Sequence, residues 1–334
     1  MSIKPVRIGV VGFGKMGLLH AGVLNTLSDV ELAAICEKSS FIRKIAKKAI
    51  RNVSFVGNLQ DFSGLDLDAV FITTSTPSHY AVTKQVYEEQ LARNVFVEKP
   101  LTSKYTDSKT LCDLAEHDGG VNMVGYMRRF MVTFMKTKEL LSQGVIGEPA
   151  FFVVNAFSAD FVGAKPSSKA SMARAGVLSD LGSYAVDLSL WFFGGLRVNS
   201  AKIECLVGSE GEDSVHVYAS RRSGGLEGQI SASWCVEGYR MPEVNVSIKG
   251  SEGLLEANDD KVSLTPNNGE KTVWFRHDLN DFVGFWLGLP EYYREDAVFV
   301  ESIRSGNGAR PSFRDALEVD QFIDAVRQKA ERHE

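Results

Sequence analysis

The sequence predicts an α/β chain of two domains: an N-terminal doubly wound parallel-sheet domain of the Rossmann type, and an α+β domain built on a large, mostly antiparallel sheet. Its 334 residues leave room for two domains of roughly 150 residues each. Strand-like runs alternate with helical patterns over residues 1–125, whereas short strand-like runs dominate residues 126–334. A glycine-rich loop also stands where the first predicted strand meets the first predicted helix.

In the first domain, apolar β-branched runs followed by amphipathic helical patterns are typical of a parallel sheet with crossover helices. After the first strand, Met16, Leu19, Val23 and Leu27 recur every three or four residues and form one apolar stripe. Strands are predicted at Val6–Val11, Glu31–Cys36, Ser54–Val56, Ala69–Thr73, Val95–Glu98 and Val121–Tyr126. Helices are predicted at Met16–Leu27, Phe41–Ile50, Tyr80–Leu91 and Ser108–His117.

In the second domain, clusters of Gly, Asn, Asp and Ser separate the strand-like runs at hairpin distances, which favours antiparallel pairing. Strands are predicted at Phe151–Phe157, Ala201–Val207, Ser214–Ala219, Leu226–Trp234, Glu243–Ile248, Gly253–Glu256, Val262–Thr265 and Thr272–Phe275. Helices are predicted at Val177–Phe193, Tyr292–Arg304 and Phe313–Arg332. The last two belong to the second domain by sequence order, and packing back on the first domain is an alternative for them.

Composition excludes several classes of protein. With 44% hydrophobic and 24% charged residues the chain is ordinary globular protein, and a net charge of −5 without a long basic run argues against nucleic acid as a partner. No stretch approaches the ~20 apolar residues of a membrane span and no signal peptide is visible, so we expect a cytoplasmic protein with no membrane partner. The four cysteines and six histidines make no metal-ligand pattern, so no metal is expected.

The glycine-rich loop Gly12-Phe13-Gly14-Lys15-Met16-Gly17 predicts dinucleotide binding. Its first glycine permits a tight turn, its second lets the backbone approach a pyrophosphate, and its third allows close helix packing. Glu37 follows 20 residues after Gly17, at the end of the second strand, where a carboxylate binds the adenosine ribose hydroxyls. That carboxylate favours NAD. Lys38 comes next and suits a 2′-phosphate, so NADP remains possible.

Two further strand ends should border the same cofactor. Parallel strands end at one sheet edge, so Thr74-Ser75-Thr76-Pro77 and Glu98-Lys99-Pro100 belong beside the glycine loop. A lysine at this edge can stabilise a developing alkoxide and lower the pKa of a neighbouring acid, as hydride transfer from an alcohol requires. A solvent-exposed lysine at a strand end is the alternative interpretation of Lys99.

Five segments together resemble the Gfo/Idh/MocA oxidoreductases. They are Gly12 to Gly17 with His20, Thr76-Pro77-Ser78-His79-Tyr80, Glu98-Lys99-Pro100, Gly125-Tyr126-Met127-Arg128-Arg129-Phe130 and Gly144-Val145-Ile146-Gly147-Glu148-Pro149. With Gly176 to Gly194 and Arg310 to Ala316, the resemblance covers essentially the whole chain. It implies an open-faced sheet, nicotinamide-dependent oxidation or reduction of sugars and related polyols, and a homodimer or homotetramer formed through that sheet. It also implies a cis peptide before Pro100 that helps to aim Lys99.

The resemblance also implies an acid–base pair beside the lysine. The family carries a helix with an Asp and, four residues later, usually a His; here Asp180 matches the first position and Tyr184 stands at the second. Tyrosine has a pKa near 10, so it serves at neutral pH as a proton donor or beside a cation. Several sugar oxidoreductases of the family look similar, whereas inositol-type enzymes have histidine. A core tyrosine bonded to Asp180 or Asp187 is the alternative interpretation.

The family places further substrate or nicotinamide contacts after the sixth strand and on the first strand of the second domain. By resemblance, Arg128 and His79 are expected near the cofactor, and Tyr126, Arg128 and Asn155 near the substrate, together with Lys99, Asp180 and Tyr184. Asp160 and Lys165 lie in a divergent loop of the same region. The aromatic residues Phe282, Phe285 and Trp286 are interpreted as core or interface packing.

The sequence thus predicts an NAD(P)-dependent oxidoreductase acting on a carbohydrate, with Lys99 steadying the substrate oxygen and Tyr184 relaying the proton. Two alternatives from other classes stay open, because one fold hosts several functions. One is a glycoside hydrolase that uses tightly held NAD for transient oxidation. The other is a non-catalytic sensor that binds nucleotide or sugar and regulates.

Overall fold

The computed structural model describes residues 4–163, 176–207, 211–239, 241–281 and 290–333, and it divides into two compact units. The first unit comprises Met1–Met127 and Val283–Leu317, and the second Arg128–Phe282 and Glu318–Glu334, each as far as it is described. The first unit extends to Met127, two residues beyond the predicted boundary, and includes the helix predicted at Tyr292–Arg304, which is the alternative placement given above for that helix. Lys165, Phe282, Phe285 and Trp286 lie outside the described residues.

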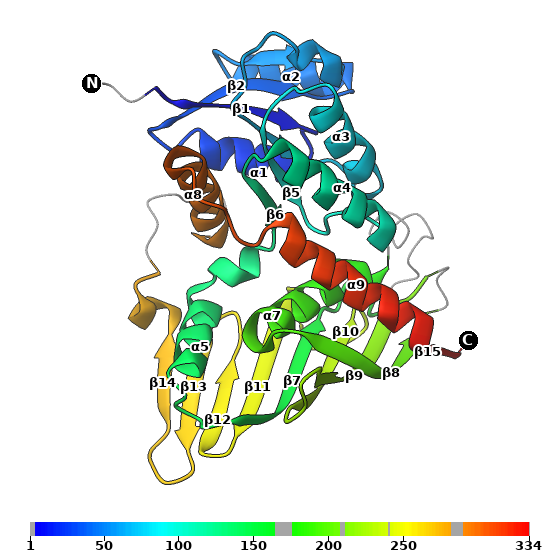
Figure 1. The fold of residues 1–334 in the computed structure, drawn as a ribbon, viewed down its shortest axis with the longest axis vertical. Helices are drawn as coiled ribbons and strands as arrows, with labels where there is room; N and C mark the ends of the chain where they lie inside the picture. Colours follow the sequence, from blue (N-terminus) through cyan, green and yellow to red (C-terminus); the bar gives the residue numbers. More distant parts are fainter. Residues whose placement is uncertain (1–3, 164–175, 208–210, 240, 282–289, 334) are drawn as a thin grey trace. The chain divides into compact units, whose positions relative to one another are not determined.

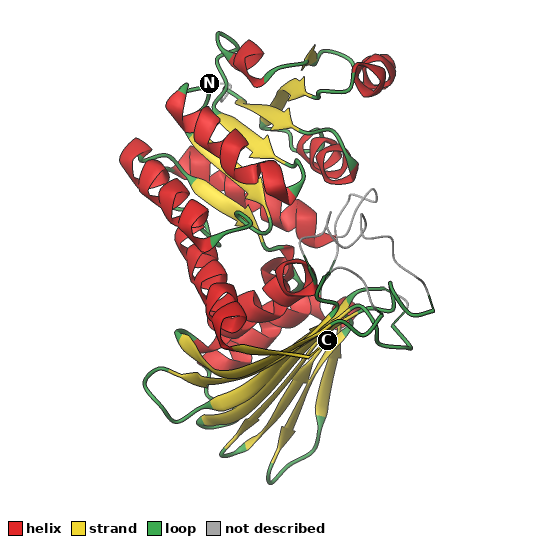
Figure 2. Ribbon diagram, turned by 90° about the vertical axis from the view of Figure 1, so that its right-hand side faces the viewer, coloured by secondary structure: helices red, strands yellow, loops and turns green. Residues whose placement is uncertain are grey.

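The first unit is a six-stranded parallel sheet in the order β3-β2-β1-β4-β5-β6, which is the Rossmann order. Helices lie on both faces of this sheet (Figure 2). Its strands are β1 (Val6–Val11), β2 (Val30–Cys36), β3 (Ser54–Val56), β4 (Ala69–Ile72), β5 (Asn94–Glu98) and β6 (Asn122–Gly125). Its helices are α1 (Lys15–Leu24), α2 (Ser40–Ala49), η1 (Leu59–Phe62), α3 (Thr76–Glu88), α4 (Tyr105–Asp118) and α8 (Pro290–Ser305). The predicted fold class is therefore confirmed.

Aromatic packing explains why α8 belongs to this unit (Figure 1). The rings of Phe71 and Phe96, from the neighbouring strands β4 and β5, stack with their centroids 4.5 Å apart. Phe299 of α8 meets both rings edge-on, at 5.3 and 5.7 Å, and all three side chains are fully buried. Edge-to-face and offset contacts of this kind stabilise beyond the area that they bury. A segment late in the sequence thus completes the core of the first unit.

The second unit is a nine-stranded sheet in the order β14-β13-β12-β11-β7-β10-β9-β8-β15, with α5 (Val132–Ser142) and α7 (Ser183–Phe193) packed on it. Its strands are β7 (Pro149–Phe157), β8 (Leu196–Glu204), β9 (Ser214–Arg221), β10 (Glu227–Ser233), β11 (Glu243–Gly250), β12 (Gly253–Ala257), β13 (Lys261–Pro266), β14 (Thr272–Phe275) and β15 (Ala330–His333). Among the described strands of this second sheet, only the pairs β7/β10 and β8/β15 are parallel. The mostly antiparallel sheet is as predicted.

Buried and partly exposed residues alternate along β7, which distinguishes the two faces of this sheet. Phe152, Val154 and Ala156 are buried, and the Phe152 ring lies 4.7 Å from that of Phe193 in α7. The intervening residues, which include Val153 and Asn155, are partly exposed on the opposite face. Because side chains alternate along a strand, one face of the sheet is covered by helices and the other is open.

Several elements differ from the sequence prediction, and β8 begins at Leu196, five residues before its predicted start. The helix predicted through Arg332 ends at Lys329 as α9 (Phe313–Lys329), and the chain continues as β15 beside β8. Helix α5 was not predicted, and the helix predicted at Val177–Phe193 begins with a π-helical turn, η3 (Leu178–Gly182). Within the described residues, no helix is long and apolar enough to cross a membrane.

Candidate functional site

The glycine-rich loop joins β1 to α1 in a form that leaves room for a phosphate. Gly12 has a φ of +89°, which side chains rarely adopt, and a Cβ on Gly17 would lie 1.9 Å from the Gly12 carbonyl oxygen. At Gly14, the N-cap of α1, an added Cβ would meet no atom within 4 Å, and no side chain caps the helix. The first N–H groups of α1 are therefore open to an anion, as a pyrophosphate requires.

The Glu37 carboxylate is fixed beside this loop. Its two oxygens accept hydrogen bonds from the backbone N–H groups of Phe13, at 2.9 Å, and Ser39, at 2.7 Å. Arg43 donates to the backbone carbonyls of Glu37 and Lys38, which holds the end of β2. A carboxylate has about four acceptor positions, so two remain for ribose hydroxyls. The loop and the carboxylate together fit an NAD adenosine and its pyrophosphate.

His79 connects the two other strand ends predicted to border the cofactor. Its Nδ1 lies 2.8 Å from the Pro100 carbonyl oxygen, and its Nε2 lies 3.0 Å from that of Thr74. The ring is buried, and burial lowers the pKa of His79. His79 thus holds the loops that carry Thr74 and Lys99 instead of presenting its own ring to solvent. The predicted cis peptide between Lys99 and Pro100 is confirmed.

A buried hydrogen-bond network supports the backbone at Lys99. The Lys99 N–H donates to Glu98 Oε2 at 3.0 Å, and the other oxygen of Glu98 lies 2.9 Å from His20 Nε2. His20 Nδ1 in turn lies 2.9 Å from an oxygen of Asp296 in α8. Burial would lower the pKa of His20, but the charges and hydrogen bonds of Asp296 and Glu98 raise it well above 6.5. The two neighbouring carboxylates therefore favour the imidazolium form of His20.

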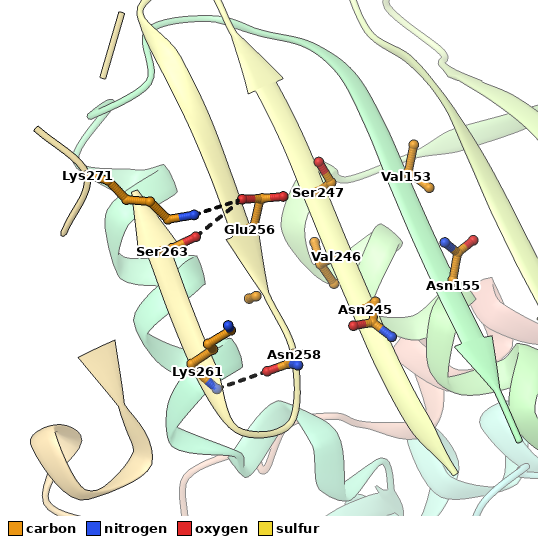
Figure 3. A pocket seen from close by; sticks show the side chains of 11 residues that line it. Val153, Asn155, Asn245, Val246, Ser247, Glu256, Asn258, Lys261, Ser263 and Lys271 are labelled. Atoms are coloured by element: carbon orange, nitrogen blue, oxygen red, sulfur yellow. Dashed lines mark hydrogen bonds and ion pairs between the residues drawn. The ribbon is translucent and has the colours of Figure 1, made fainter. Parts of the chain in front are cut away.

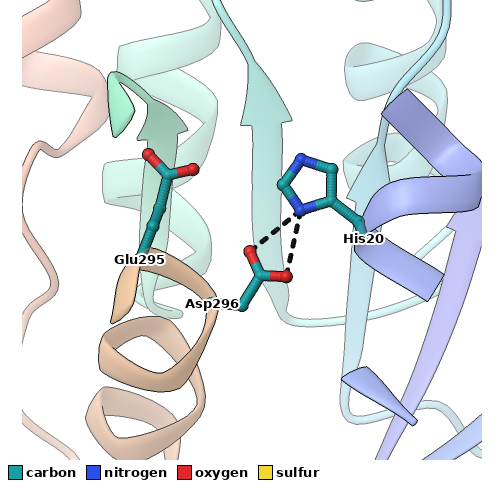
Figure 4. Close-up of side chains that lie close together, drawn as sticks. All are labelled: His20, Glu295 and Asp296. Carbon is teal, nitrogen blue, oxygen red and sulfur yellow. Dashed lines mark hydrogen bonds and ion pairs between the residues drawn. The ribbon is translucent and has the colours of Figure 1, made fainter. Parts of the chain in front are cut away.

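Two members of this network, His20 and Asp296, together with Glu295 have the spacing of a metal site. His20, Glu295 and Asp296 each offer one ligand atom within 4.8 Å of the others (Figure 4). A metal ligand must be a neutral imidazole with a free nitrogen. Both nitrogens of His20 already lie at hydrogen-bond distance from the carboxylates of Asp296 and Glu98, so neither nitrogen is left for a metal ion.

In the second unit, η3 and α7 carry the two predicted acid–base residues. Asp180 lies in the π-helical turn and Tyr184 in the first turn of α7. Between Gly176 and Ser189 these two are the residues that are not buried. The predicted apolar stripe of Leu181, Ala185, Leu188 and Phe192 is buried beside them. This helix therefore leaves one pair of polar side chains, four residues apart, accessible.

Two buried arginines contact α7. Arg129 makes a bidentate pair with Asp187, at 2.7 to 3.1 Å. Arg128 pairs with Asp259, and its guanidinium carbon lies 5.1 Å from the centroid of the Tyr184 ring. Arg128 was predicted to contact cofactor or substrate, but these contacts engage its guanidinium within the protein. Sequence reasoning missed Asp259 and Asp296, because both lie more than 100 residues from their partners.

Tyr126 and Asn155, the other residues of the second-domain region predicted to contact substrate, are not accessible beside Asp180 and Tyr184 in the way the prediction expects: one is buried and the other lies on the opposite face of the sheet. Tyr126 is fully buried. Asn155 lies on the open face of the sheet, where it lines a hollow of about 250 Å³ with Asn245, Glu256 and Lys271 (Figure 3). Asp160 is exposed after β7. Asn155 is thus on the face of β7 that α7 does not cover.

The fold and the glycine-loop site define an oxidoreductase with an NAD-binding Rossmann domain. The sequence pattern of the Gfo/Idh/MocA oxidoreductase family, NAD-binding Rossmann fold, matches residues 6–126, and that of the family's C-terminal domain matches residues 134–256. The chain belongs to the Gfo/Idh/MocA oxidoreductase family, as the resemblance predicts.

Relatives match over nearly the full length. A myo-inositol 2-dehydrogenase of Thermotoga maritima is 25% identical over 90% of this chain and 89% of its own. An inositol 2-dehydrogenase of Rhizobium meliloti is 24% identical over 98% of both chains. A levoglucosan dehydrogenase solved with NADH and levoglucosan has a TM-score of 0.85 at 17% identity, covering 98% of this chain and 97% of its own. That structural likeness shows the same fold.

The His20 network makes stability depend on pH. Because the pKa of His20 is raised in the folded state, its stabilising contribution should be complete below about pH 6.5, the unfolded value, and be lost as the pH rises through the folded value. Urea unfolding of the wild type and His20→Gln across this range measures it. The wild type should lose stability on the alkaline side relative to His20→Gln; parallel curves would contradict the charged state.

Removing one carboxylate from the network should be costly. Asp296→Ala leaves a fully buried imidazolium with one partner fewer, and breaking a buried ion pair costs about 3–5 kcal/mol. The free energy of unfolding measures the change, with the exposed Asp260→Ala as a control. A loss for Asp296→Ala no larger than for the control would show that His20 is neutral.

Proposed function

We propose that the protein transfers hydride between NAD and the CH–OH or C=O carbon of a sugar or polyol, with Lys99 stabilising the substrate oxygen and Tyr184 relaying its proton. When bound, the nicotinamide supplies the hydride acceptor or donor. The observation that carries the proposal is the accessible pair Asp180 and Tyr184 on a helix that is otherwise buried between Gly176 and Ser189. A tyrosine needed only for packing would be expected to lie among the buried positions.

Lys99 suits the role of oxygen-binding group. It follows β5 at the carboxyl edge of the parallel sheet, where ligands of doubly wound folds bind. Its side chain is partly exposed, while its backbone is held by Glu98 and, through the Pro100 carbonyl, by His79. Such support fixes the backbone from which the ammonium group extends, and a preorganised cation stabilises a developing alkoxide more than a mobile one does.

Tyr184 suits the role of proton relay. In the reducing direction its hydroxyl donates a proton to the oxygen of the new alcohol; in the oxidising direction the phenolate accepts the hydroxyl proton. The phenolate needs a neighbouring cation at neutral pH, because the ordinary pKa of tyrosine is near 10. We propose that Asp180, one turn earlier and equally accessible, binds a neighbouring substrate hydroxyl.

The substrate class rests on the relatives. Two of them, by name, oxidise inositols, and a third protein of the same fold is a levoglucosan dehydrogenase. All of these compounds carry rings of secondary hydroxyls, so we propose a cyclic sugar or polyol. The tyrosine at position 184, where inositol-type relatives are expected to have histidine, favours a sugar over an inositol.

Substitutions at the two proposed catalytic residues test the mechanism. Lys99→Met should lower the rate of hydride transfer about 10²–10³-fold, and Tyr184→Phe about 10²–10⁴-fold, because each removes an interaction made in the transition state. Single-turnover nicotinamide absorbance measures the rate. NAD affinity should stay within a few fold in both variants.

Matched variants control for these substitutions. Lys104→Met changes an exposed lysine at the start of α4, and Tyr218→Phe removes a hydroxyl bonded to Glu227 on the second sheet. Neither should change the rate. An unchanged rate in Lys99→Met or Tyr184→Phe would remove that residue from the mechanism.

Glu37 should select NAD over NADP. Losing a charged hydrogen-bond partner of the ribose costs about 1.5–3 kcal/mol, so Glu37→Ser should weaken NAD binding about ten- to a hundredfold and strengthen NADP binding. Calorimetric titration with both cofactors measures this. Equal weakening of both would mean that Glu37 only holds the loop, through Phe13 and Ser39.

We also propose that the open face of the second sheet joins copies of the chain into a homodimer or homotetramer, as the family resemblance implies. Val153 lies on this face, so Val153→Arg would add a charge to the interface. Sedimentation should show an oligomer for the wild type and a smaller species for Val153→Arg. A monomeric wild type would contradict the proposal.

A further inference from the structure

Arg128 lies against the ring of the proposed proton relay. Its guanidinium carbon is 5.1 Å from the centroid of Tyr184, which is within the range of a cation–π contact. The side chain of Arg128 is only 3% exposed. The resemblance leads us to expect Arg128 beside substrate or nicotinamide, but its observed contact is with the residue proposed to act on the substrate.

Two contacts with oxygen atoms fix the guanidinium in that position. One terminal nitrogen pairs with Asp259, and the other donates to the Pro242 carbonyl oxygen at 3.1 Å. Asp259 itself accepts a hydrogen bond from the Val244 N–H at 3.3 Å, at the start of β11. The planar guanidinium is thus held by Pro242, which precedes β11, and by Asp259 in the turn between β12 and β13, with the Tyr184 ring against it.

Helix α7 is anchored by contacts other than the one between Arg128 and Tyr184. The neighbouring Arg129 binds Asp187 of α7 through two nitrogens and lies 5.8 Å from the Trp191 ring. A bidentate buried pair of this kind anchors a helix by itself. The contact between Arg128 and Tyr184 is therefore not needed to anchor α7, and we attribute its effect to the tyrosine side chain itself.

We infer that Arg128 is a positioning residue for the reaction: it holds the Tyr184 ring in place and sets a fixed positive charge beside it. Asp259 and the Pro242 carbonyl keep the guanidinium there. This inference rests on the proposed role of Tyr184 as proton relay. It assigns to Arg128 an action through the protein side of the site, distinct from binding the substrate or the cofactor.

Arg128→Lys and Arg128→Met test the inference. A cation–π contact of ordinary strength corresponds to about a 2- to 30-fold change, so Arg128→Met should lower kcat by about that factor. Arg128→Lys keeps the charge without the planar fork and should recover part of the loss. KM for the substrate and NAD affinity should stay within about twofold. A rise in KM at unchanged kcat would instead make Arg128 a substrate-binding residue and overturn the inference.

Removing the arginine leaves Asp259 without its cation, so Arg128→Met could fail to fold. The variant Arg128→Met/Asp259→Leu replaces the pair by apolar residues, which buried pairs often tolerate. It should fold and show the same loss of kcat as Arg128→Met. A folded double variant with wild-type kcat would overturn the inference.

A double-mutant cycle with Tyr184→Phe separates positioning from structural damage. If Arg128 acts through the tyrosine hydroxyl, Arg128→Lys should lower the single-turnover rate in the wild type and leave it unchanged in Tyr184→Phe. An equal loss in both backgrounds would overturn the inference. Arg129→Lys is the matched control and should give equal effects in both. Should Tyr184→Phe alone leave the rate unchanged, the proposed function fails instead, and the cycle distinguishes the two failures.

Discussion

The parallel pairing of six strands is the constraint on which the cofactor half of this protein depends. Because the strands run in one direction, the glycine loop after β1, Glu37 after β2, Thr74 after β4 and Lys99 after β5 all lie at one sheet edge. The backbone there is locked by buried side chains. The buried His79 ring lies at hydrogen-bond distance from the Thr74 and Pro100 carbonyl oxygens, and Glu98 accepts a hydrogen bond from the Lys99 N–H. The positions of the reactive groups thus follow from strand order and from a few buried or partly buried hydrogen bonds.

In the second unit, the consecutive residues Arg128 and Arg129 fix the position of α7 and of the Tyr184 ring. Arg129 and Asp187 fix α7, and Arg128 connects the start of β11, through Asp259 and Pro242, to the Tyr184 ring. Buried ion pairs of this kind add little to stability compared with apolar replacements, but they fix one arrangement strongly, because either partner alone is very unfavourable. The same physics holds His20 between Glu98 and Asp296 in the first unit. In each unit, a charged side chain of a buried charge network contacts a residue proposed for catalysis: Glu98 accepts from the Lys99 N–H, and Arg128 lies against the Tyr184 ring.

Local sequence predicted most of the fold. All six parallel strands were placed to within a residue at their starts, because parallel strands are buried on both faces and read as continuous apolar runs. The final strand β15 was missed, since Ala330 to His333 has the charged composition of a helix end and pairs with β8 only in the folded chain.

The sequence also placed Asp180 and Tyr184 on one helix, from their spacing. It could not find Asp259 or Asp296, because a contact across more than 100 residues leaves no local pattern. The family resemblance is what predicted a ligand contact for Arg128; the structure gives its guanidinium Asp259 and the Tyr184 ring as partners within the chain.

The most direct test of the account is the nicotinamide absorbance of the wild-type protein mixed with NAD or NADH and a panel of aldoses, ketoses, anhydrosugars and inositols. The account predicts a substrate-dependent change in absorbance with at least one cyclic sugar or polyol, larger with NAD than with NADP. A protein that binds NAD but changes its absorbance with none of these compounds would contradict the assignment as an oxidoreductase of CH–OH groups.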